Sequence, residues 1–458
     1  MSVLASLYSG ISGIVSNGSA LSVSGDNIAN MNTTAFKSSN ALFESNLTQR
    51  IGDVQIGLGS RLAATNTAFS VGSFANSTRN TDMAIEGEGF FAVQNPSGER
   101  LYTRAGAFSR NDQGLLVTTV GGFQLLGSRI NEEGNIVGTP GAIDLTDFSS
   151  APLASSSIRM NLNLDPMAAL PGGVLDATSF SAAEASSNFS VPSTMYDSRG
   201  TPREVITYFR RTGDNEWQAA TLTDAANLGA PVTAADGSTV VLKAWNVTFN
   251  SDGTLNTVAA DNIGLVVWDD DTAGTGSPNE DAVLAGEILN GAIPWSGSDP
   301  LSFAEFSLDL GQAGGLGNAT QYDLGSGSNA KFVGSNGRGV GELQSIDVTA
   351  AGRVRGIFSN GDSRDLYSIP IALFSNNEGL ARIGSNLYQE TASSGSALLG
   401  EAGSNGRGQV RAFALEQSNV DLASEFVKII QYQRGFQASA RTISAAADIL
   451  QELVNLGR

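Results

Sequence analysis

Residues 422–454 read LASEFVKIIQYQRGFQASARTISAAADILQELV, and their apolar side chains recur at alternating intervals of three and four. Residues 4–28, at the other end of the chain, read LASLYSGISGIVSNGSALSVSGDNI and have the same spacing. Because residues three or four apart share one face of an α-helix, each stretch predicts a long helix with an apolar stripe. The predicted stripe residues are Leu4, Leu7, Ile11, Ile14, Leu21 and Ile28, together with Leu422, Phe426, Ile429, Phe436, Ile443, Leu450 and Val454.

The N-terminal helix should be weak by itself. Its stripe includes Gly18 and Gly25, and Asp26 is the only charged residue in 3–30. Each glycine inside a helix costs up to about 1 kcal/mol relative to alanine, so such a helix forms mainly when it packs against neighbours. We expect the stripes to pack against each other and against other copies of the chain, which makes them a subunit interface. The alternative is an ordinary core helix.

The C-terminal helix is predicted to run from about Val420 to Leu456. Ser418 or Asn419 is expected to cap it, because a side-chain oxygen at that place accepts a free backbone N–H. Asp421 lies near the positive end of the helix dipole, where a carboxylate is favourable.

Between the two ends, short apolar runs alternate with turn sequences. Residues 90–93 (FFAV) and 115–117 (LLV) are such runs, and Pro96-Ser97-Gly98 and Asp112-Gln113-Gly114 are such turns. This pattern is typical of β-hairpins. The expected fold class is mixed and mainly β, with β-rich middle domains of sandwich or barrel type. Long N- and C-terminal α-helices flank them and pair as a coiled-coil-like inner domain.

Composition shifts predict the domain boundaries. Residues 38–70 are rich in Gly, Asn and Thr and predict an extended linker, and an Ala-, Ser-, Leu- and Pro-rich stretch near 150–171 predicts a domain crossing. The predicted domains are a discontinuous helical assembly domain (1–37 with 413–458), the linker 38–70, a discontinuous β-rich inner domain (71–157 with 335–412) and a β-rich outer domain (158–334) of one or two subdomains.

The composition excludes several classes of function. The net charge of −19 argues against a nucleic-acid partner, because a surface that follows phosphates needs clustered Lys and Arg. The chain has no Cys and no His, which excludes thiol nucleophiles, disulfides, Cys/His metal sites and histidine bases. No stretch approaches the roughly 18 apolar residues of a membrane span, so no membrane insertion is expected. Residues 1–36 have no basic residue and no unbroken apolar run, so no Sec signal peptide is expected.

No catalytic, cofactor-binding or metal site is predicted. Residues 269–280 begin with Asp-Asp-Asp-Thr-Ala-Gly and end with Glu, which partly matches a calcium-binding loop. Ala273 stands where a ligand belongs, and strand-like sequence precedes the loop, so a surface acidic loop is the preferred interpretation. Asp82 and Glu86 could form a carboxylate pair, but nothing in the sequence sets their separation. We therefore expect a protein that is not an enzyme.

The middle region also carries the tryptophans and much of the acid. Segment 244–330 has twelve Asp or Glu and no Lys or Arg, which is typical of a solvated outer surface that resists sticking. The four tryptophans are Trp217, Trp245, Trp268 and Trp295. They are predicted to lie in a sandwich core; the alternative is a surface that stacks on sugars.

Two blocks near the N-terminus are residues 24–30 (SGDNIAN) and 34–37 (TAFK), and two near the C-terminus are 415–422 (LEQSNVDL) and 433–437 (QRGFQ). They resemble the N- and C-terminal signatures of the family of flagellar rod, hook and hook-associated proteins. Further blocks that look like this family are 80–91 (NTDMAIEGEGFF), 102–108 (YTRAGAF) and 114–117 (GLLV). At Ala35 the sequence departs from the family, which usually has Gly before the Phe. The signature residues are Asn27, Asn30, Phe36, Lys37, Ser418, Asn419, Val420 and Asp421.

Residues 193–200 (STMYDSRG) and 374–380 (FSNNEGL) resemble hook-type members of the family. The resemblance implies a subunit of the bacterial flagellar hook, exported by the flagellar type III apparatus without a cleaved Sec signal peptide. Such subunits polymerise outside the cell into a flexible helical tube that passes torque from rod to filament. The implied partners are other copies of the chain, a hook cap, the distal rod protein, the hook–filament junction protein and the export apparatus. The alternatives are a distal-rod or junction axial protein, which shares the terminal signatures, or an extracellular adhesin.

Overall fold

The fold is described from a computed structural model, and the chain divides into two compact units. Unit 1 comprises Met1–Phe148, Leu343–Ile357 and Ser363–Arg458, and unit 2 comprises Ser149–Glu342 and Phe358–Asp362. The residues that the structure describes are 2–46, 48–51, 54–57, 59–227, 239–260, 265–268, 278–279, 307–312 and 319–456. The predicted helical domain falls in unit 1, as does most of the predicted inner β domain. Residues 149–157, 335–342 and 358–362 of that predicted inner domain instead fall in unit 2, together with the predicted outer domain.

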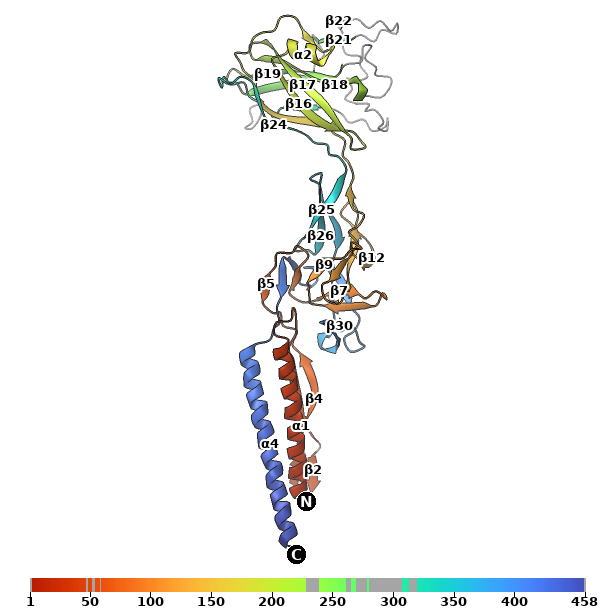
Figure 1. The fold of residues 1–458 in the computed structure, drawn as a ribbon, viewed down its shortest axis with the longest axis vertical. Helices are drawn as coiled ribbons and strands as arrows, with labels where there is room; N and C mark the ends of the chain where they lie inside the picture. Colours follow the sequence, from red (N-terminus) through yellow and green to blue (C-terminus); the bar gives the residue numbers. More distant parts are fainter. Residues whose placement is uncertain are drawn as a thin grey trace. The chain divides into compact units, whose positions relative to one another are not determined.

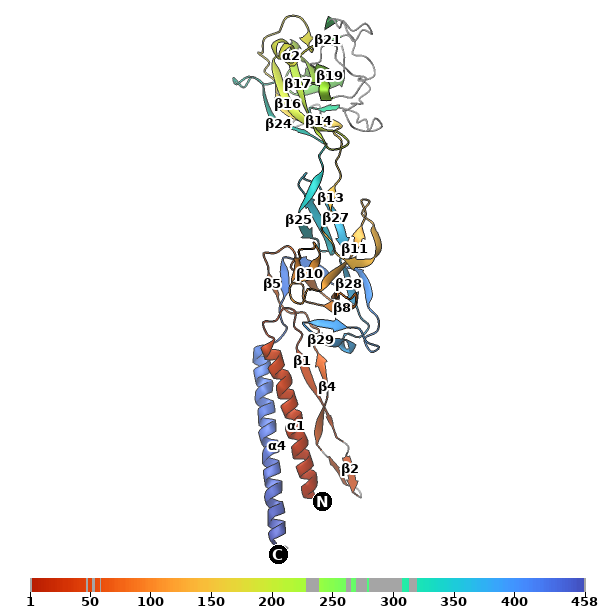
Figure 2. The ribbon, with the colours of Figure 1, turned by 45° about the vertical axis from the view of Figure 1, so that its right-hand side comes forward.

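Both predicted terminal helices are present in unit 1. Helix α1 spans Ser2–Ala29 and α4 spans Leu422–Leu456, and they lie side by side (Figures 1 and 2). A Cβ atom built at Gly10 would lie 2.7 Å from Ile443, and one built at Gly13 would lie 2.4 Å from Ser439. Asn17 approaches Gly435 in the same way. Later residues of α1 thus contact earlier residues of α4, so the two helices are antiparallel. The small residues at these contacts let the two backbones approach closely.

The close approach predicts different effects of alanine at two glycines of α1. Gly18 has open space around its Cβ position, whereas a Cβ on Gly13 would meet the Ser439 hydroxyl. We expect Gly18→Ala to stabilise the helix by about 1 kcal/mol, because alanine is the better helix former. In Gly13→Ala the new methyl group would clash with the Ser439 hydroxyl, so we expect no net stabilisation. Thermal melting followed by α-helical ellipticity measures both; an equal gain in the two variants would contradict the close approach.

The segment predicted as an extended linker, 38–70, forms a β-hairpin along α1. Strands β1 (Ser39–Ser45) and β4 (Ser60–Thr67) pair antiparallel, and β2 (Thr48–Ile51) pairs with β3 (Val54–Gly57). The Ser12 hydroxyl accepts a hydrogen bond from Ser60 N at 3.3 Å, which joins the hairpin to α1. The ring of Phe43 lies edge-on to Tyr432 of α4, with centroids 6.2 Å apart. Polar residues thus form strands here because each strand pairs with the other and rests on the helices.

The β part of unit 1 is built from strands that come from both halves of the chain. Its main sheet has the order β25-β26-β27-β11-β7-β8-β30-β29, and β32 pairs with β6 while β33 pairs with β5. Phe69, Phe90, Tyr102, Phe374 and Tyr388 form an aromatic core, with ring centroids 4.8 to 5.8 Å apart. The strand bounds are β5 Phe74–Asn76, β6 Met83–Glu86, β7 Phe90–Gln94, β8 Arg100–Thr103, β9 Phe108–Arg110, β10 Leu116–Thr118, β11 Gln124–Ile130, β12 Ile136–Ala142, β25 Gly341–Val348, β26 Arg353–Phe358, β27 Ser363–Ser368, β28 Pro370–Leu373, β29 Ala381–Gly384, β30 Leu387–Gln389, β31 Leu398–Glu401, β32 Gln409–Ala412 and β33 Ala414–Glu416.

Unit 2 has two sheets that share a hydrophobic core. An antiparallel sheet runs β16-β17-β18-β19-β20, and a smaller sheet has the order β23-β14-β24. Trp217 and Trp245 are buried between apolar residues of both sheets, as the sandwich-core interpretation predicted. The element bounds are β13 Ser149–Ser150, β14 Ser157–Asn163, β15 Leu175–Asp176, α2 Phe180–Ser186, β16 Phe189–Tyr196, β17 Pro202–Gly213, β18 Glu216–Asp224, β19 Thr239–Phe249, β20 Leu255–Ala260, β21 Leu265–Trp268, β22 Pro278–Asn279, β23 Ser307–Asp309 and β24 Asn329–Ser335.

Three sequence predictions fall on residues that the structure does not describe. The loop 269–280 lies mostly outside the described residues, and so do Trp295 and the side chain of Trp268. Among the residues that are described, no group of His, Cys, Asp or Glu could hold a metal ion. Over those described residues, the helices include none with the length and hydrophobicity of a membrane span.

Candidate functional site

The two helices expose apolar side chains on the sides that they turn away from each other. These side chains leave 50–65% of their surface exposed and are Tyr8, Ile11 and Val15 on α1 and Phe426, Val427 and Ile430 on α4. At about 100° per residue, each set lies roughly opposite the line of residues through which its helix contacts the other helix. Soluble proteins bury most such side chains, so exposed apolar patches on two opposite sides indicate contacts with other molecules.

The predicted stripe residues divide between these exposed faces and the helix contact. Ile11, Phe426 and Phe436 are exposed. The half-buried stripe residues are Leu7, Ile14, Leu21, Ile28, Leu422, Ile429, Ile443 and Leu450, and the side chains of Leu4 and Val454 are outside the described residues. The stripe therefore contributes to the contact between the two helices as well as to the exposed faces.

Sequence reasoning missed four of the exposed residues: Tyr8, Val15, Val427 and Ile430. They lie off the heptad-spaced stripe from which the interface was predicted. A second apolar set at positions 8, 11 and 15 is visible in the sequence, and this spacing of three and four is the signal that could have identified it.

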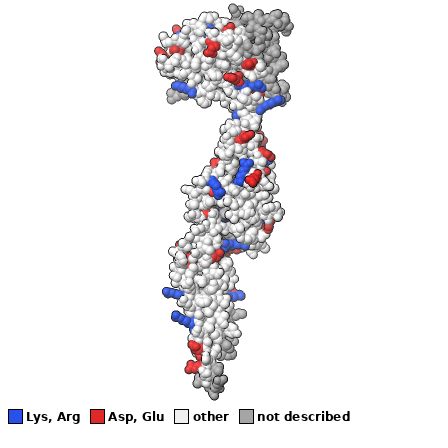
Figure 3. All heavy atoms as spheres, in the orientation of Figure 1, with Lys and Arg blue, Asp and Glu red and all other residues white. Residues whose placement is uncertain are grey.

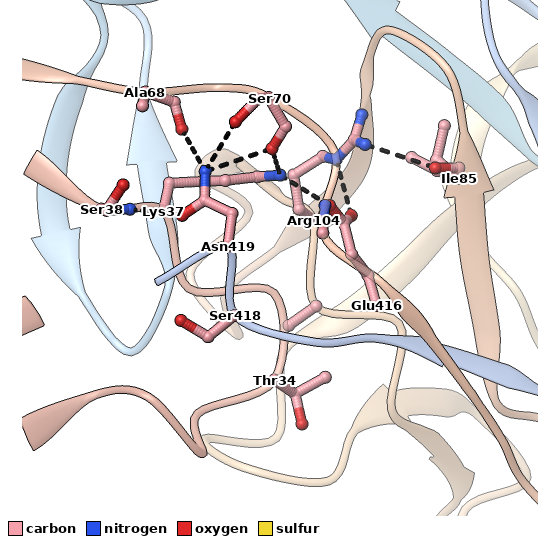
Figure 4. Close-up of polar contacts among 12 residues, drawn as sticks. Thr34, Lys37, Ser38, Ala68, Ser70, Ile85, Arg104, Glu416, Ser418 and Asn419 are labelled. Carbon is pink, nitrogen blue, oxygen red and sulfur yellow. Dashed lines mark hydrogen bonds and ion pairs between the residues drawn. The ribbon is translucent and has the colours of Figure 1, made fainter. Parts of the chain in front are cut away.

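A buried polar cluster joins the connection after α1 to the strand that precedes α4 (Figure 4). Lys37 Nζ lies 2.6 Å from Glu416 Oε1, and Arg104 Nε lies 3.1 Å from Glu416 Oε2. All three side chains are almost fully buried. Lys37 also donates to the carbonyl of Ser70, and Arg104 donates to the carbonyls of Gly87 and Gly89. We call Lys37, Arg104 and Glu416 the charged junction.

The charged junction holds two cations around one carboxylate in a dry environment. Burial lowers the pKa of Lys37 below its ordinary value, and the Glu416 carboxylate opposes part of that shift. A buried ion pair of this kind depends on complete pairing, because an unpaired buried charge is very costly. Glu416 also accepts from Gly72 N at 2.9 Å. The polar atoms of the charged junction thus pair with one another and with backbone groups, as expected for a structural joint.

The lowered pKa of Lys37 predicts a pH dependence of stability. In the unfolded chain the Lys37 ammonium has its ordinary pKa of about 10.4, whereas in the folded chain it loses its proton at a lower pH. Since the unfolded state binds more protons in that window, the free energy of unfolding should rise as pH rises from the folded pKa toward 10.4. Urea unfolding of the native protein and of Lys37→Met across this range measures the difference. A stability difference that falls with rising pH would contradict the assignment.

Three other signature residues make hydrogen bonds that hold the hairpin segment and the end of α1. Asn419 accepts from Ser38 N at 2.8 Å and donates to the carbonyl of Ala68 at 2.8 Å, so it connects α4 to both ends of the hairpin segment. Asn27 is buried and exchanges two hydrogen bonds with the Ser39 backbone. Asn30 donates to the Asp26 carbonyl in the last turn of α1.

The cap of α4 differs from the prediction. Asp421 takes the capping role, because its carboxylate accepts from Ala423 N and the Ser424 hydroxyl. These hydrogen bonds lower the pKa of Asp421. Ser418 instead accepts from Val420 N one turn earlier, and Asn419 is used in the junction. The helix starts at Leu422 because the residues before it are held by the hairpin segment.

Ala35 explains the usual glycine before Phe36. Its φ is +57°, in the left-handed region, and its side chain is fully buried. An alanine in that conformation costs about 1 kcal/mol relative to glycine. We expect Ala35→Gly to raise the free energy of unfolding by about that amount, measured by urea unfolding. A decrease would mean that the buried methyl group contributes more than the strain costs.

Comparisons with known proteins agree with this geometry. Residues 161–337 match the family described as flagellar basal body protein FlaE D2 domain, 84–147 the flagellar hook protein FlgE/F/G D1 domain, and 411–456 the flagellar basal body rod FlgEFG protein C-terminal family. The flagellar hook protein FlgE of Escherichia coli (strain K12) is 32% identical, over 97% of this chain and 98% of that protein. FlgE of Salmonella typhimurium is 33% identical over the same shares, and FlgE of Treponema pallidum is 31% identical over all of both chains.

The three matched segments contain strand β33 with Glu416, helix α4, most of unit 2 and the N-terminal strands of the main sheet of unit 1. With more than 30% identity over nearly the whole chain, these relatives establish the family. The chain belongs to the flagellar hook protein family.

Proposed function

We propose that this chain is a structural subunit of the bacterial flagellar hook that polymerises into a helical tube. The proposal is carried by one observation: the paired helices α1 and α4 expose two apolar faces, on opposite sides of the pair. When two different faces of one subunit fit each other, each added copy presents a new free face. Such a contact extends into a filament when its rotation does not close a ring.

The exposed faces are large enough to drive assembly. Fully burying one large apolar side chain stabilises by about 1.5–3 kcal/mol. The six side chains of the two faces are already about half-buried, so burying the rest supplies on the order of 5 kcal/mol per contact. The subunit would gain more from several neighbours in a tube wall than from one.

The same helices support export as an unfolded chain. Helix α1 carries one charged residue and four glycines, and its partners are α4, the hairpin and, in this proposal, other copies. Before assembly such a helix has little intrinsic stability. We propose that the terminal segments pair in coiled-coil fashion only after export through the flagellar type III apparatus.

The β units would form the outer layers of the tube and allow it to bend. Bending requires neighbouring copies to slide, which favours polar contacts of modest area between β units. We propose that the tube serves as the universal joint that transmits torque from rod to filament outside the cell. Its other partners would be the hook cap, the distal rod protein and the hook–filament junction protein.

Microscopy of the purified protein tests the proposal. Sulfate strengthens the burial of apolar surface, so polymerisation is induced with increasing sulfate and followed by negative-stain electron microscopy. We expect curved, flexible tubes. Straight, rigid polymers would favour a distal-rod protein. A protein that stays monomeric at every sulfate concentration would contradict the proposal.

A further inference from the structure

One hexapeptide, Gly-Ser-Asn-Gly-Arg-Gly, occurs twice in the chain, at 334–339 and at 403–408. Each copy contains an Asn-Gly pair, and three further pairs begin at Asn17, Asn290 and Asn360. Asn-Gly is the dipeptide most prone to lose ammonia from its side chain, because glycine has no Cβ to keep its backbone nitrogen away from the asparagine carboxamide. Asn290 lies outside the described residues, which leaves four pairs to compare.

The carboxamide of Asn405 is unrestrained. Asn405 is exposed in the turn between β31 and β32, and nothing among the described residues forms a hydrogen bond with its side chain. Gly406 N, the backbone nitrogen next to it, also makes no hydrogen bond within that part of the chain. Asn405 and Gly406 have φ angles of +49° and +82°, and the space around the Cβ position of Gly406 is open. The turn therefore leaves both reacting groups free to approach each other.

The identical hexapeptide at 334–339 restrains its asparagine. Asn336 Oδ1 accepts from Ser156 N at 2.9 Å and from Ser157 N at 3.0 Å. Asn336 Nδ2 donates to the Ser156 hydroxyl at 2.8 Å. Since the six residues of the two copies are the same, the difference between Asn336 and Asn405 comes from the structure around them.

The other two described pairs are restrained as well. Asn360 Nδ2 donates to the carbonyl of Gly339 at 2.8 Å, and its Oδ1 accepts from Asp362 N at 3.1 Å. Asn17 donates to the carbonyl of Gly13 at 2.7 Å inside α1, where the backbone N–H groups are used by the helix. Of the four described pairs, the one at Asn405 has the fewest restraints.

We propose that Asn405 is a site of spontaneous deamidation. Gly406 N attacks Asn405 Cγ, so that a C–N bond forms, the Cγ–Nδ2 bond breaks and ammonia leaves with the proton of Gly406 N. Water then opens the resulting cyclic imide at either of its two carbonyls, which leaves aspartate or isoaspartate at position 405. The reaction needs only water, so the modified share of the chains rises with the age of the protein. This inference is independent of the proposed function.

Deamidation changes both the charge and the backbone of the turn. On the face of the molecule in Figure 3 most atoms belong to uncharged residues, and the charged side chains are scattered. One added carboxylate per chain is therefore a distinct change that isoelectric focusing detects. Isoaspartate also inserts a methylene carbon into the backbone, next to Arg407. Arg407 ties the turn to β28 and β31 through the carbonyls of Ile371 at 3.0 Å and Leu398 at 2.9 Å, so we expect isoaspartate to weaken these bonds.

Peptide mapping of the full-length protein during incubation at mildly alkaline pH tests the proposal. Trypsin cuts after Lys and Arg, so the pairs at 405, 336 and 360 fall in three separate peptides: 383–407, 332–338 and 356–364. We expect mass spectrometry to show deamidation of 383–407 on the order of tenfold faster than of the other two, because their asparagine hydrogen bonds must break first. In protein unfolded in urea, the two copies of the hexapeptide should deamidate at equal rates.

Three results would overturn the proposal. The first is equal deamidation of 383–407 and 332–338 in the folded protein, and the second is a preference for 383–407 that persists in urea. The third concerns Asn405→Gln, whose longer side chain forms the cyclic imide far more slowly. We expect this variant to lack the acidic species that accumulates in the native protein, and its appearance at an unchanged rate would place the modification elsewhere.

Discussion

Phe426→Asp should abolish polymerisation and leave the subunit folded. Phe426 is 53% exposed on the side of α4 that faces away from α1, so it makes little contribution inside the chain. In the proposed tube, the carboxylate would be placed in an apolar contact without a partner, which is strongly unfavourable. Sedimentation and electron microscopy measure polymer formation, and far-UV circular dichroism measures folding.

Two further variants separate assembly from folding. Phe426→Leu keeps an apolar side chain and should still form tubes. Ile443→Asp differs because Ile443 lies against Gly10 within the same chain, so we expect it to reduce both helicity and polymerisation. Tubes of native appearance from Phe426→Asp would refute the placement of this face between subunits.

Glu416→Gln should be among the most destabilising single substitutions in unit 1. Glu416 is the only carboxylate that pairs with Lys37 and Arg104 within the described residues. The amide keeps the shape of the side chain but leaves two buried cations without a counter-charge. Removing one member of a buried ion pair typically costs about 3–5 kcal/mol. Urea unfolding, followed by the loss of α-helix and β-sheet signals, measures the change.

An exposed ion pair provides the matched control. Glu132 pairs with Arg364 at 3.1 Å but is largely exposed to solvent. Exposed pairs contribute about 0–1 kcal/mol, so Glu132→Gln should change the free energy of unfolding little. Equal effects of Glu416→Gln and Glu132→Gln would show that the charged junction is not a structural joint.

Several features could be predicted because they depend on neighbours along the chain. Helices α1 and α4 follow from the spacing of their apolar residues, and the β-rich middle follows from short apolar runs between turns. The buried positions of Trp217 and Trp245 also follow the expectation for a sandwich core. The left-handed backbone at Ala35, where the family usually has Gly, was not predicted and is known only from the structure.

Other features depend on residues that are distant in the sequence. Lys37 and Glu416 meet across 379 residues, and no local pattern predicts that pairing. For the same reason the hairpin within 38–70 was not anticipated, because its polar strands are stabilised by each other and by α1. The capping of α4 by Asp421 also depends on distant contacts, since Asn419 is held by Ser38 and Ala68.

Periodicity in the chain thus specifies which segments are helices and which residues share a face, since that is a matter of backbone geometry alone. It does not specify which face is covered. Folding brings small residues of α1 and α4 together, and this contact leaves Tyr8, Val15, Val427 and Ile430 exposed. Close packing of distant segments decides which apolar surface remains free, and here that free surface is the basis of the proposed assembly.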